Sequence, residues 1–217
     1  MVPIISIAVF LPLLGAALLM VLRRPPGRVA HGIGIVTSGL SFALTLWIWS
    51  RGVAETGFAQ VEEIAWIPAI GAAYRVGVDG ISLPLVLLTG LLFFLSFIYS
   101  AKVSDRPHVY VILMLMLETA SLGTFVALDG LLFYVFFEVS LVSMYFMIAG
   151  WGYEDRQRAA LMFFLYTLLG SLPLLLAILG LYLASDPFTF DMRVWIDAPP
   201  LSGLAAMLAL IAMIFTF

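Results

Sequence analysis

The fold is decided by residues 110–149, which read YVILMLMLETASLGTFVAL, then Asp129-Gly130, then LLFYVFFEVSLVSMYFMIA. Each apolar run is close to the ~20 residues that a helix needs to cross the hydrocarbon core of a bilayer. The Asp129-Gly130 pair between the two runs predicts a tight turn. The pattern therefore predicts two consecutive membrane-spanning helices of opposite direction.

Apolar runs of similar length occupy most of the remaining chain, because 64% of its 217 residues are hydrophobic and only 11% are charged. A soluble core of this size does not need that composition. We predict spans at Val2–Leu22, Val29–Ser50, Ile81–Ala101, Tyr110–Leu128, Leu131–Ala149 and Ala159–Ala184. The predicted fold class is all-α, a polytopic transmembrane helical bundle of about seven spans.

The seventh span, Leu204–Phe217, has only 14 residues and contains no Gly, Pro or basic residue of the kind that closes a helix. We therefore expect this span to be incomplete and the chain to be part of a longer protein. We treat residues 1–217 as a single transmembrane domain, with leading helices at 1–107 and a further helical repeat that starts at 108–217.

The charged residues predict the orientation of the chain, since basic residues near helix ends stay on the cytoplasmic side. One set of alternate loops has seven basic residues against three acidic ones. The basic residues of this set are Arg23, Arg24, Arg28, Lys102, Arg106, Arg156 and Arg158. The N-terminus is therefore predicted to lie outside, in the periplasm of a Gram-negative bacterium.

Two acidic residues, Glu118 and Glu138, fall inside the predicted spans. At 1.5 Å per residue they lie roughly 16 and 12 Å from the Asp129-Gly130 turn, so both are near the middle of the membrane. Adjacent helices pack about 8–10 Å apart, which allows direct or one-water contact between the two. Carboxyl groups at this depth are costly and usually serve function, so both are candidates for proton translocation, Glu138 first.

Polar residues at helical spacing predict a hydrated path around the two glutamates. Tyr134 and Tyr145 fall on one face with Glu138, and Ser121 lies three residues after Glu118. The supporting residues that we predict are Tyr134, Tyr145, Ser121, Tyr166 and Thr167. Pro173 has no N–H to donate, so it is predicted to break the sixth helix. The alternative is that these groups only pack, with each glutamate permanently protonated and hydrogen-bonded to a neighbouring hydroxyl.

The absence of cysteine excludes disulfides, thiolate metal sites and cysteine-held iron–sulfur clusters. We therefore expect any redox centre to lie in another chain. Nothing in the sequence predicts a metal site or binding to nucleic acid, and the expected surroundings are membrane lipid.

Several stretches resemble a known family; they are GVDGISLP at 77–84, FYVFFE at 133–138, SMYFMI at 143–148, GWG at 150–152, FFLYT at 163–167 and Gly170-Ser171. They are similar to the antiporter-like subunits of proton-pumping NADH:quinone oxidoreductase, respiratory complex I. The stretch from Phe133 to Ser171 most resembles subunit M. Met162 departs from the pattern, since relatives commonly have a lysine at that point.

This resemblance implies a non-redox, proton-translocating subunit of roughly fourteen helices, built on two inverted five-helix repeats. The family's glutamate on the fifth helix falls on Glu138, and its lysine partner would follow residue 217. The resemblance also implies that this chain binds no cofactor, that flavin, iron–sulfur clusters and quinone lie in other subunits, and that neighbouring membrane subunits in a bacterial inner membrane are the partners.

Two other functions fit the same residues. The first is a subunit of a multisubunit cation/proton antiporter or a membrane-bound hydrogenase, relatives that share the motif around Asp79. The second is a structural membrane scaffold in which both glutamates stay protonated.

Overall fold

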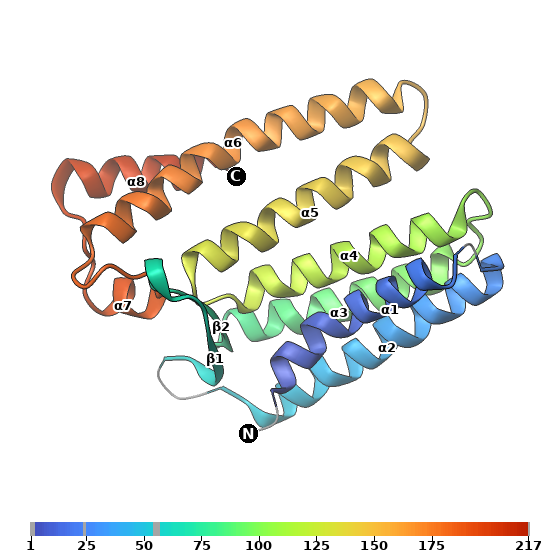
Figure 1. Cartoon of the computed structure of the whole chain (residues 1–217), viewed down its shortest axis with the longest axis horizontal. Helices are drawn as coiled ribbons and strands as arrows, with labels where there is room; N and C mark the ends of the chain where they lie inside the picture. The colour runs from blue at the N-terminus through green and yellow to red at the C-terminus, as the bar shows by residue number, and fades with distance from the viewer. Residues whose placement is uncertain (1–2, 24, 54–56, 217) are drawn as a thin grey trace. The chain divides into compact units, whose positions relative to one another are not determined.

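The computed structural model describes residues 3–23, 25–53 and 57–216, and Figure 1 shows their arrangement into helices and one small sheet. Among these residues, six helices are long and apolar enough to cross a membrane. They are α1 (Ile4–Val21), α2 (Gly27–Arg51), α3 (Ser82–Ser100), α4 (Pro107–Val126), α5 (Gly130–Trp151) and α6 (Arg156–Ala184). A shorter apolar helix, α8 (Gly203–Thr216), follows. The predicted helical membrane fold is thus confirmed, while Val2, Arg24 and Phe217 lie outside the described residues.

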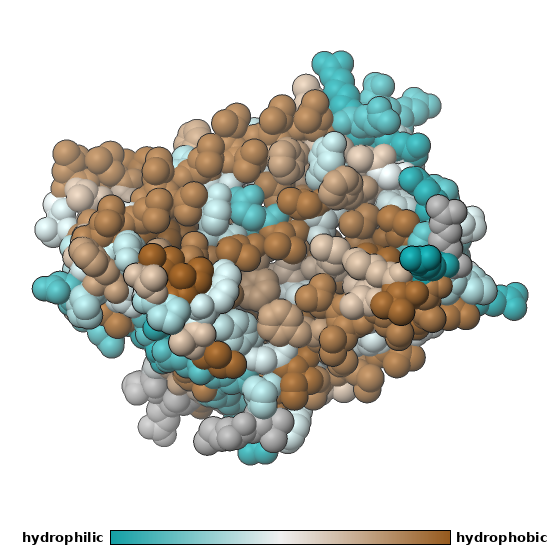
Figure 2. Space-filling model, in the orientation of Figure 1, coloured by the Kyte–Doolittle hydropathy of each residue, from teal (hydrophilic) through white to brown (hydrophobic). Residues whose placement is uncertain are grey.

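Large apolar side chains cover the outer faces of these helices, for example Leu14, which is 65% exposed, and Leu176, which is 68% exposed. Figure 2 shows hydrophobic residues along the helices and hydrophilic residues mainly near their ends. Such a surface suits contact with lipid, because the hydrocarbon core solvates apolar side chains and excludes charged ones.

The chain divides into two compact units, and the first comprises Met1–Glu62 and Val76–Val126. In this unit α4 packs against α1, α2 and α3. A side chain on Gly34 of α2 would lie 2.9 Å from both Phe97 and Val111, so glycine is needed where these helices meet closely. The carboxylate of Glu62 accepts hydrogen bonds from the N–H groups of Ile5 and Ser6 and thereby caps α1.

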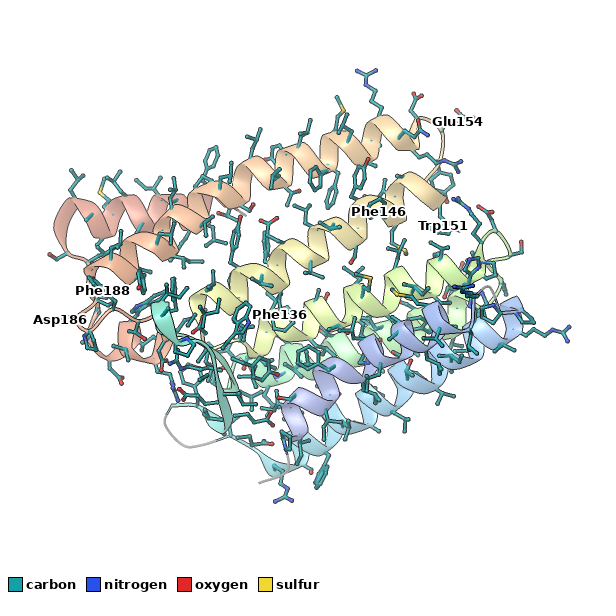
Figure 3. The ribbon with its side chains drawn as sticks, viewed as in Figure 1. Phe136, Phe146, Trp151, Glu154, Asp186 and Phe188 are labelled. Atoms are coloured by element: carbon teal, nitrogen blue, oxygen red, sulfur yellow. The ribbon has the colours of Figure 1, made fainter. Side chains whose placement is uncertain are left out.

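The second unit comprises Glu63–Arg75 and Ala127–Phe217. Here α5 and α8 both pack against α6. Figure 3 shows Trp151 and Glu154 at the turn from α5 into α6, and Asp186 and Phe188 beyond the other end of α6. The buried core of this unit contains Leu174, Ile178, Phe190 and Trp195. The predicted division at residue 107 remains a prediction, although α4 packs with the leading helices.

The expected break at Pro173 is not a break of the helix, because α6 continues through it to Ala184. Proline removes one N–H donor, but the residues after it stay helical. Leu174, Ala177 and Ile178 are buried directly after Pro173, and this packing holds the second half of α6 in place.

Two elements were not predicted. A β-hairpin made of β1 (Ala59–Ile67) and β2 (Ala72–Val78), joined by the short helix η1 (Pro68–Ile70), lies between α2 and α3. A short helix, α7 (Met192–Asp197), lies between α6 and α8. Both occur in the segments that the sequence assigned to loops.

Candidate functional site

Glu138 lies where α5 packs against α6. The hydroxyl of Ser171 on α6 donates to Glu138 Oε1 at 2.6 Å. Ser171 is fully buried, whereas Glu138 is half-buried. The site therefore joins a carboxyl group to a hydroxyl that is held inside the protein.

Ser171 has a second acceptor, because its hydroxyl also lies 3.0 Å from the carbonyl oxygen of Leu168. A hydroxyl has one proton and two lone pairs. When Glu138 is a carboxylate, the Ser171 hydroxyl can donate to it. When Glu138 is a carboxylic acid, the hydroxyl can donate to the Leu168 carbonyl and accept a hydrogen bond from the acid. The same pair of residues thus satisfies both protonation states of Glu138.

Tyr134 is the predicted path residue that the structure brings to this site. It lies one helical turn before Glu138 on α5, and its hydroxyl interacts with both Ser171 and Glu138. The three side chains form a polar cluster, which we call the Glu138 cluster. The sequence placed Tyr134 on the correct face but did not identify Ser171 as the direct partner, although Gly170-Ser171 was one of the stretches that carried the resemblance.

The structure places the other predicted path residues of this unit elsewhere. The ring of Tyr145 packs against Phe164, with 5.3 Å between ring centroids. The hydroxyl of Thr167 donates to the carbonyl of Phe163 within its own helix. Tyr166 is 84% exposed and lies on the outer face of α6.

Glu118 lies in the first unit and is fully buried. The Ser38 hydroxyl of α2 donates to its Oε1 at 2.9 Å, while Oε2 has no hydrogen-bond partner among the described residues. The expected neighbour, Ser121, is half-buried and does not hydrogen-bond Glu118. Ser38, Ser41 and Thr45 recur at helical spacing on α2 and are all fully buried, a pattern that could have predicted this partner.

Contact between Glu118 and Glu138 stays a prediction, since the two residues belong to different units. Within its own unit, each glutamate has a serine hydroxyl from a neighbouring helix as its donor. The two sites differ in how many groups surround the carboxyl and in how deeply it is buried.

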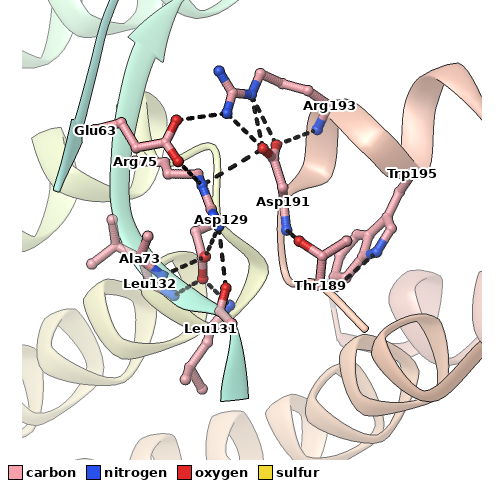
Figure 4. Close-up of polar contacts among 11 residues, drawn as sticks. Glu63, Ala73, Arg75, Asp129, Leu131, Leu132, Thr189, Asp191, Arg193 and Trp195 are labelled. Atoms are coloured by element: carbon pink, nitrogen blue, oxygen red, sulfur yellow. Dashed lines mark hydrogen bonds and ion pairs between the residues drawn. The ribbon is translucent and has the colours of Figure 1, made fainter. Parts of the chain in front are cut away.

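A second polar cluster lies in the second unit at the start of α5. We call it the outer ion network, and its members are Glu63, Arg75, Asp129, Asp191 and Arg193 (Figure 4). Arg75 of β2 lies 2.9 Å from Asp129, 2.8 Å from Glu63 and 3.6 Å from Asp191. Arg193 of α7 pairs with Asp191 and lies 3.0 Å from Glu63.

This network also closes backbone ends. Asp129 is the N-cap of α5, and its side chain accepts from the N–H groups of Leu131, Leu132 and Ala73. Burial raises the pKa of Asp129 above its ordinary value, and Arg75 together with these backbone donors opposes that rise. The hydrogen bond from Arg75 holds the pKa of Glu63 below its ordinary value. The sequence missed this network because its five charges were assigned to three different loops.

Comparison with known proteins finds similar chains among the subunits of NADH:quinone oxidoreductases. Residues 127–217 match the model of a family described as NADH:quinone oxidoreductase/Mrp antiporter, TM. The chain is 37% identical to NAD(P)H-quinone oxidoreductase chain 4 2 of Trichodesmium erythraeum, over 88% of this chain and 34% of the relative. It is 39% identical to NADH-quinone oxidoreductase subunit M of Mycobacterium tuberculosis, over 88% of this chain and 41% of the relative.

The fold agrees with a solved structure of respiratory complex I from Thermus thermophilus with bound NADH. The TM-score is 0.84 at 34% identity, and the match covers 98% of this chain and 43% of the solved chain. The chain thus spans roughly a third to two fifths of the length of the proteins it matches. Residues 127–217 thus match the family shared by NADH:quinone oxidoreductases and Mrp antiporters, and the chain is similar to subunits of NADH-quinone oxidoreductases along nearly its whole length.

Proposed function

We propose that this chain is part of a proton-translocating membrane subunit of an NADH:quinone oxidoreductase, and that Glu138 is its exchangeable carboxyl group. The observation that carries this assignment is the Ser171 hydroxyl, which has a hydrogen-bonding arrangement for both the carboxylate and the carboxylic acid of Glu138. A group that takes up and releases a proton needs both states to be satisfied. Tyr134 supplies a further hydroxyl at the same point.

The chemistry of the site is proton transfer alone. When Glu138 is ionised it accepts from Ser171, and when it is protonated it donates to a hydroxyl or to water in a polar path. A cation that approaches the site favours the carboxylate, and its departure favours the acid, so a distant charge change can load and unload the proton. In the family that this chain resembles, that cation is a lysine, which would follow residue 217.

The surroundings of this subunit follow from the same proposal. Electron transfer occurs in other subunits, which hold the flavin, the iron–sulfur clusters and the quinone, and neighbouring antiporter-like subunits are the partners in the membrane. The location is a bacterial inner membrane with the N-terminus on the periplasmic side, supported by the excess of basic residues in one set of loops. Glu118 is a weaker candidate for proton translocation, because only one hydroxyl serves it.

The test is Glu138→Gln in the full-length subunit within the assembled complex. Glutamine keeps a hydrogen-bonding side chain of similar size but cannot exchange a proton. We expect proton pumping in inverted membrane vesicles to be lost or sharply reduced, while the complex still assembles on native gels. The matched control is Glu154→Gln in the α5–α6 turn, which should pump normally. Normal pumping by Glu138→Gln would overturn the assignment.

The second candidate function is a subunit of a cation/proton antiporter, since the matching family model includes Mrp antiporters. Glu138 would exchange protons in that case too, but the gradient would be consumed instead of built. Purification of the native assembly separates the two. Flavin and iron–sulfur subunits that purify with this chain support the oxidoreductase, and an assembly of membrane subunits alone supports the antiporter.

A further inference from the structure

A cavity of about 590 Å³ lies in the first unit, where α2 begins and α3 is followed by α4. Its walls include Arg28, His31, Gly32 and Ile35 of α2, and Lys102 and Pro107 from the α3–α4 connection. All three helices are long and apolar enough to cross a membrane, and the cavity lies at their ends. It is therefore located at the level of the lipid headgroups.

The cavity has two cationic side chains and no carboxylate in its described lining. Neither Arg28 nor Lys102 forms an ion pair with any residue that the structure describes. The nearby carboxylate of Asp105 pairs instead with Arg106, and neither of these two lines the cavity. Two unpaired cations at one opening give the cavity a positive potential that favours an anion.

The first turn of α2 adds backbone donors to this wall. Its N-cap residue is Pro26, which makes no side-chain capping hydrogen bond. The first N–H groups of a helix have no partner inside the helix, and an anion is their usual ligand where no side chain caps them. Gly27 and Arg28 therefore offer N–H groups beside the two cationic side chains.

His31 is the buried polar group of the cavity, with only 5% of the residue exposed. Its Nε2 lies 3.0 Å from the carbonyl oxygen of Val103, and because a carbonyl only accepts, Nε2 is the donor. Nδ1 has no hydrogen-bond partner among the described residues. An unpartnered polar atom at this burial is rare, and a bound ligand that forms a hydrogen bond with Nδ1 would satisfy it.

The cavity is not wholly polar, since Ile35 and Pro107 also line it. Further along α2, Val36 is 59% exposed and Leu40 is 53% exposed. Backbone donors, cations and a histidine therefore lie at one end of an apolar helix face. This arrangement suits a lipid in which a phosphate ester is joined to hydrocarbon chains.

We propose that this cavity binds the phosphate group of an anionic phospholipid, with the acyl chains along the exposed face of α2. Arg28, Lys102 and the N–H groups of the first turn of α2 contact the phosphate oxygens, and a hydrogen bond to the lipid headgroup satisfies His31 Nδ1. Inorganic phosphate shares this chemistry but lacks the hydrocarbon that the apolar face receives.

The test measures phosphatidylglycerol bound to the full-length subunit in its assembled complex, by native mass spectrometry after transfer to phosphatidylcholine nanodiscs. In the double variant Arg28→Gln, Lys102→Gln, the affinity for phosphatidylglycerol should fall by about thirtyfold, since each basic side chain near the surface contributes about one factor of five. Arg106→Gln is the matched control. It removes an exposed cation from the same connection without changing the cavity, and it should retain the lipid.

A second variant tests the cavity without removing charge. A Cβ atom on Gly32 would meet nothing within 4 Å, and Gly32 lines the cavity, so Gly32→Leu adds apolar atoms to this space. It should also release the lipid, while Gly32→Ala should retain it. If the double variant and Gly32→Leu both retained as much phosphatidylglycerol as the unchanged subunit, the proposal would be overturned. Competition by millimolar inorganic phosphate, combined with no preference for phosphatidylglycerol over phosphatidylcholine, would overturn the lipid assignment.

Discussion

Glu118 and Asp129 are equally buried, with 0% of each residue exposed, yet their surroundings suit opposite charge states. Glu118 has one hydroxyl donor, and its second oxygen has no partner among the described residues. Asp129 accepts from the Arg75 guanidinium and from three backbone N–H groups. The first site supplies one neutral donor, and the second supplies four donors, one of which is a cation. Equal burial therefore does not mean equal surroundings, because the number and charge of the donors distinguish the two carboxyl groups.

Glu138 lies between these two cases. It is half-buried, and the hydroxyls of Ser171 and Tyr134 surround it without a cation among the described contacts. We propose that these intermediate surroundings allow Glu138 to exchange a proton, and the following variants test this.

The largest effect is expected for Asp129→Ala, which removes the N-cap of α5 and the buried partner of the half-buried Arg75. Breaking one side of a buried ion pair costs about 3 kcal/mol or more. We expect a loss of this size in the free energy of unfolding, measured by SDS titration of the full-length subunit in detergent micelles. Asp197→Ala, at an exposed position at the end of α7, is the control and should change little.

Ser38→Ala should be less harmful, because Glu118 then loses one neutral donor and no charged partner. An unsatisfied buried polar group costs roughly 2 kcal/mol. The same unfolding titration in a Glu118→Met background serves as the control, since no carboxyl group remains to be satisfied. An equal loss in both backgrounds would contradict the role assigned to the Ser38 hydroxyl.

Ser171→Ala should cost only about 1 kcal/mol of stability, since Tyr134 still serves the half-buried Glu138. Its effect on pumping should be clearer, with the initial rate falling roughly fivefold, because both protonation states of Glu138 lose the Ser171 hydroxyl. Ser140→Ala, which removes a hydroxyl bonded to its own helix on α5, is the matched control. If the two variants pumped equally well, Ser171 would have no part in proton exchange.

The smallest effect concerns pH and Glu63, whose side chain is 45% exposed. Arg75 lowers the pKa of Glu63 in the folded protein below the ordinary 4.5. The carboxylate therefore contributes stability that is present above about pH 4.5 and is lost as the pH falls through the lower, folded pKa. Glu63→Gln should reduce the acid sensitivity of unfolding slightly in this window, and Glu154→Gln should not.

The sequence predicted the membrane helices well because their signal is local. The span expected at Ile81–Ala101 is α3 at Ser82–Ser100, and the span expected at Leu131–Ala149 is α5 at Gly130–Trp151. The length and hydropathy of an apolar run suffice for this, whatever the rest of the chain does. The hairpin and α7 gave no such signal, since a short strand or helix outside the membrane depends on tertiary contacts.

The site was predicted less completely, because its contacts are distant in sequence. The position of Glu138 and the face of Tyr134 follow from helical periodicity. The Ser38–Glu118 pair joins residues 80 apart, and periodicity within one helix cannot find such a partner. Tyr166 illustrates the opposite error, since a polar residue in a span need not face the interior and this one is 84% exposed.

The outer ion network also has a consequence for biogenesis. Arg75 and Glu63 belong to the hairpin, but Arg193 follows Glu63 by 130 residues. A ribosome and an insertion machinery that deliver the chain from its N-terminus place the hairpin outside the membrane long before α7 exists. Its charges remain hydrated until α5, α6 and α7 have been threaded and the loop between them has arrived. This network therefore closes only when α7 has arrived, with α8 of the same unit still to follow, and insertion that stalls before that point leaves Glu63 of the hairpin without Arg193.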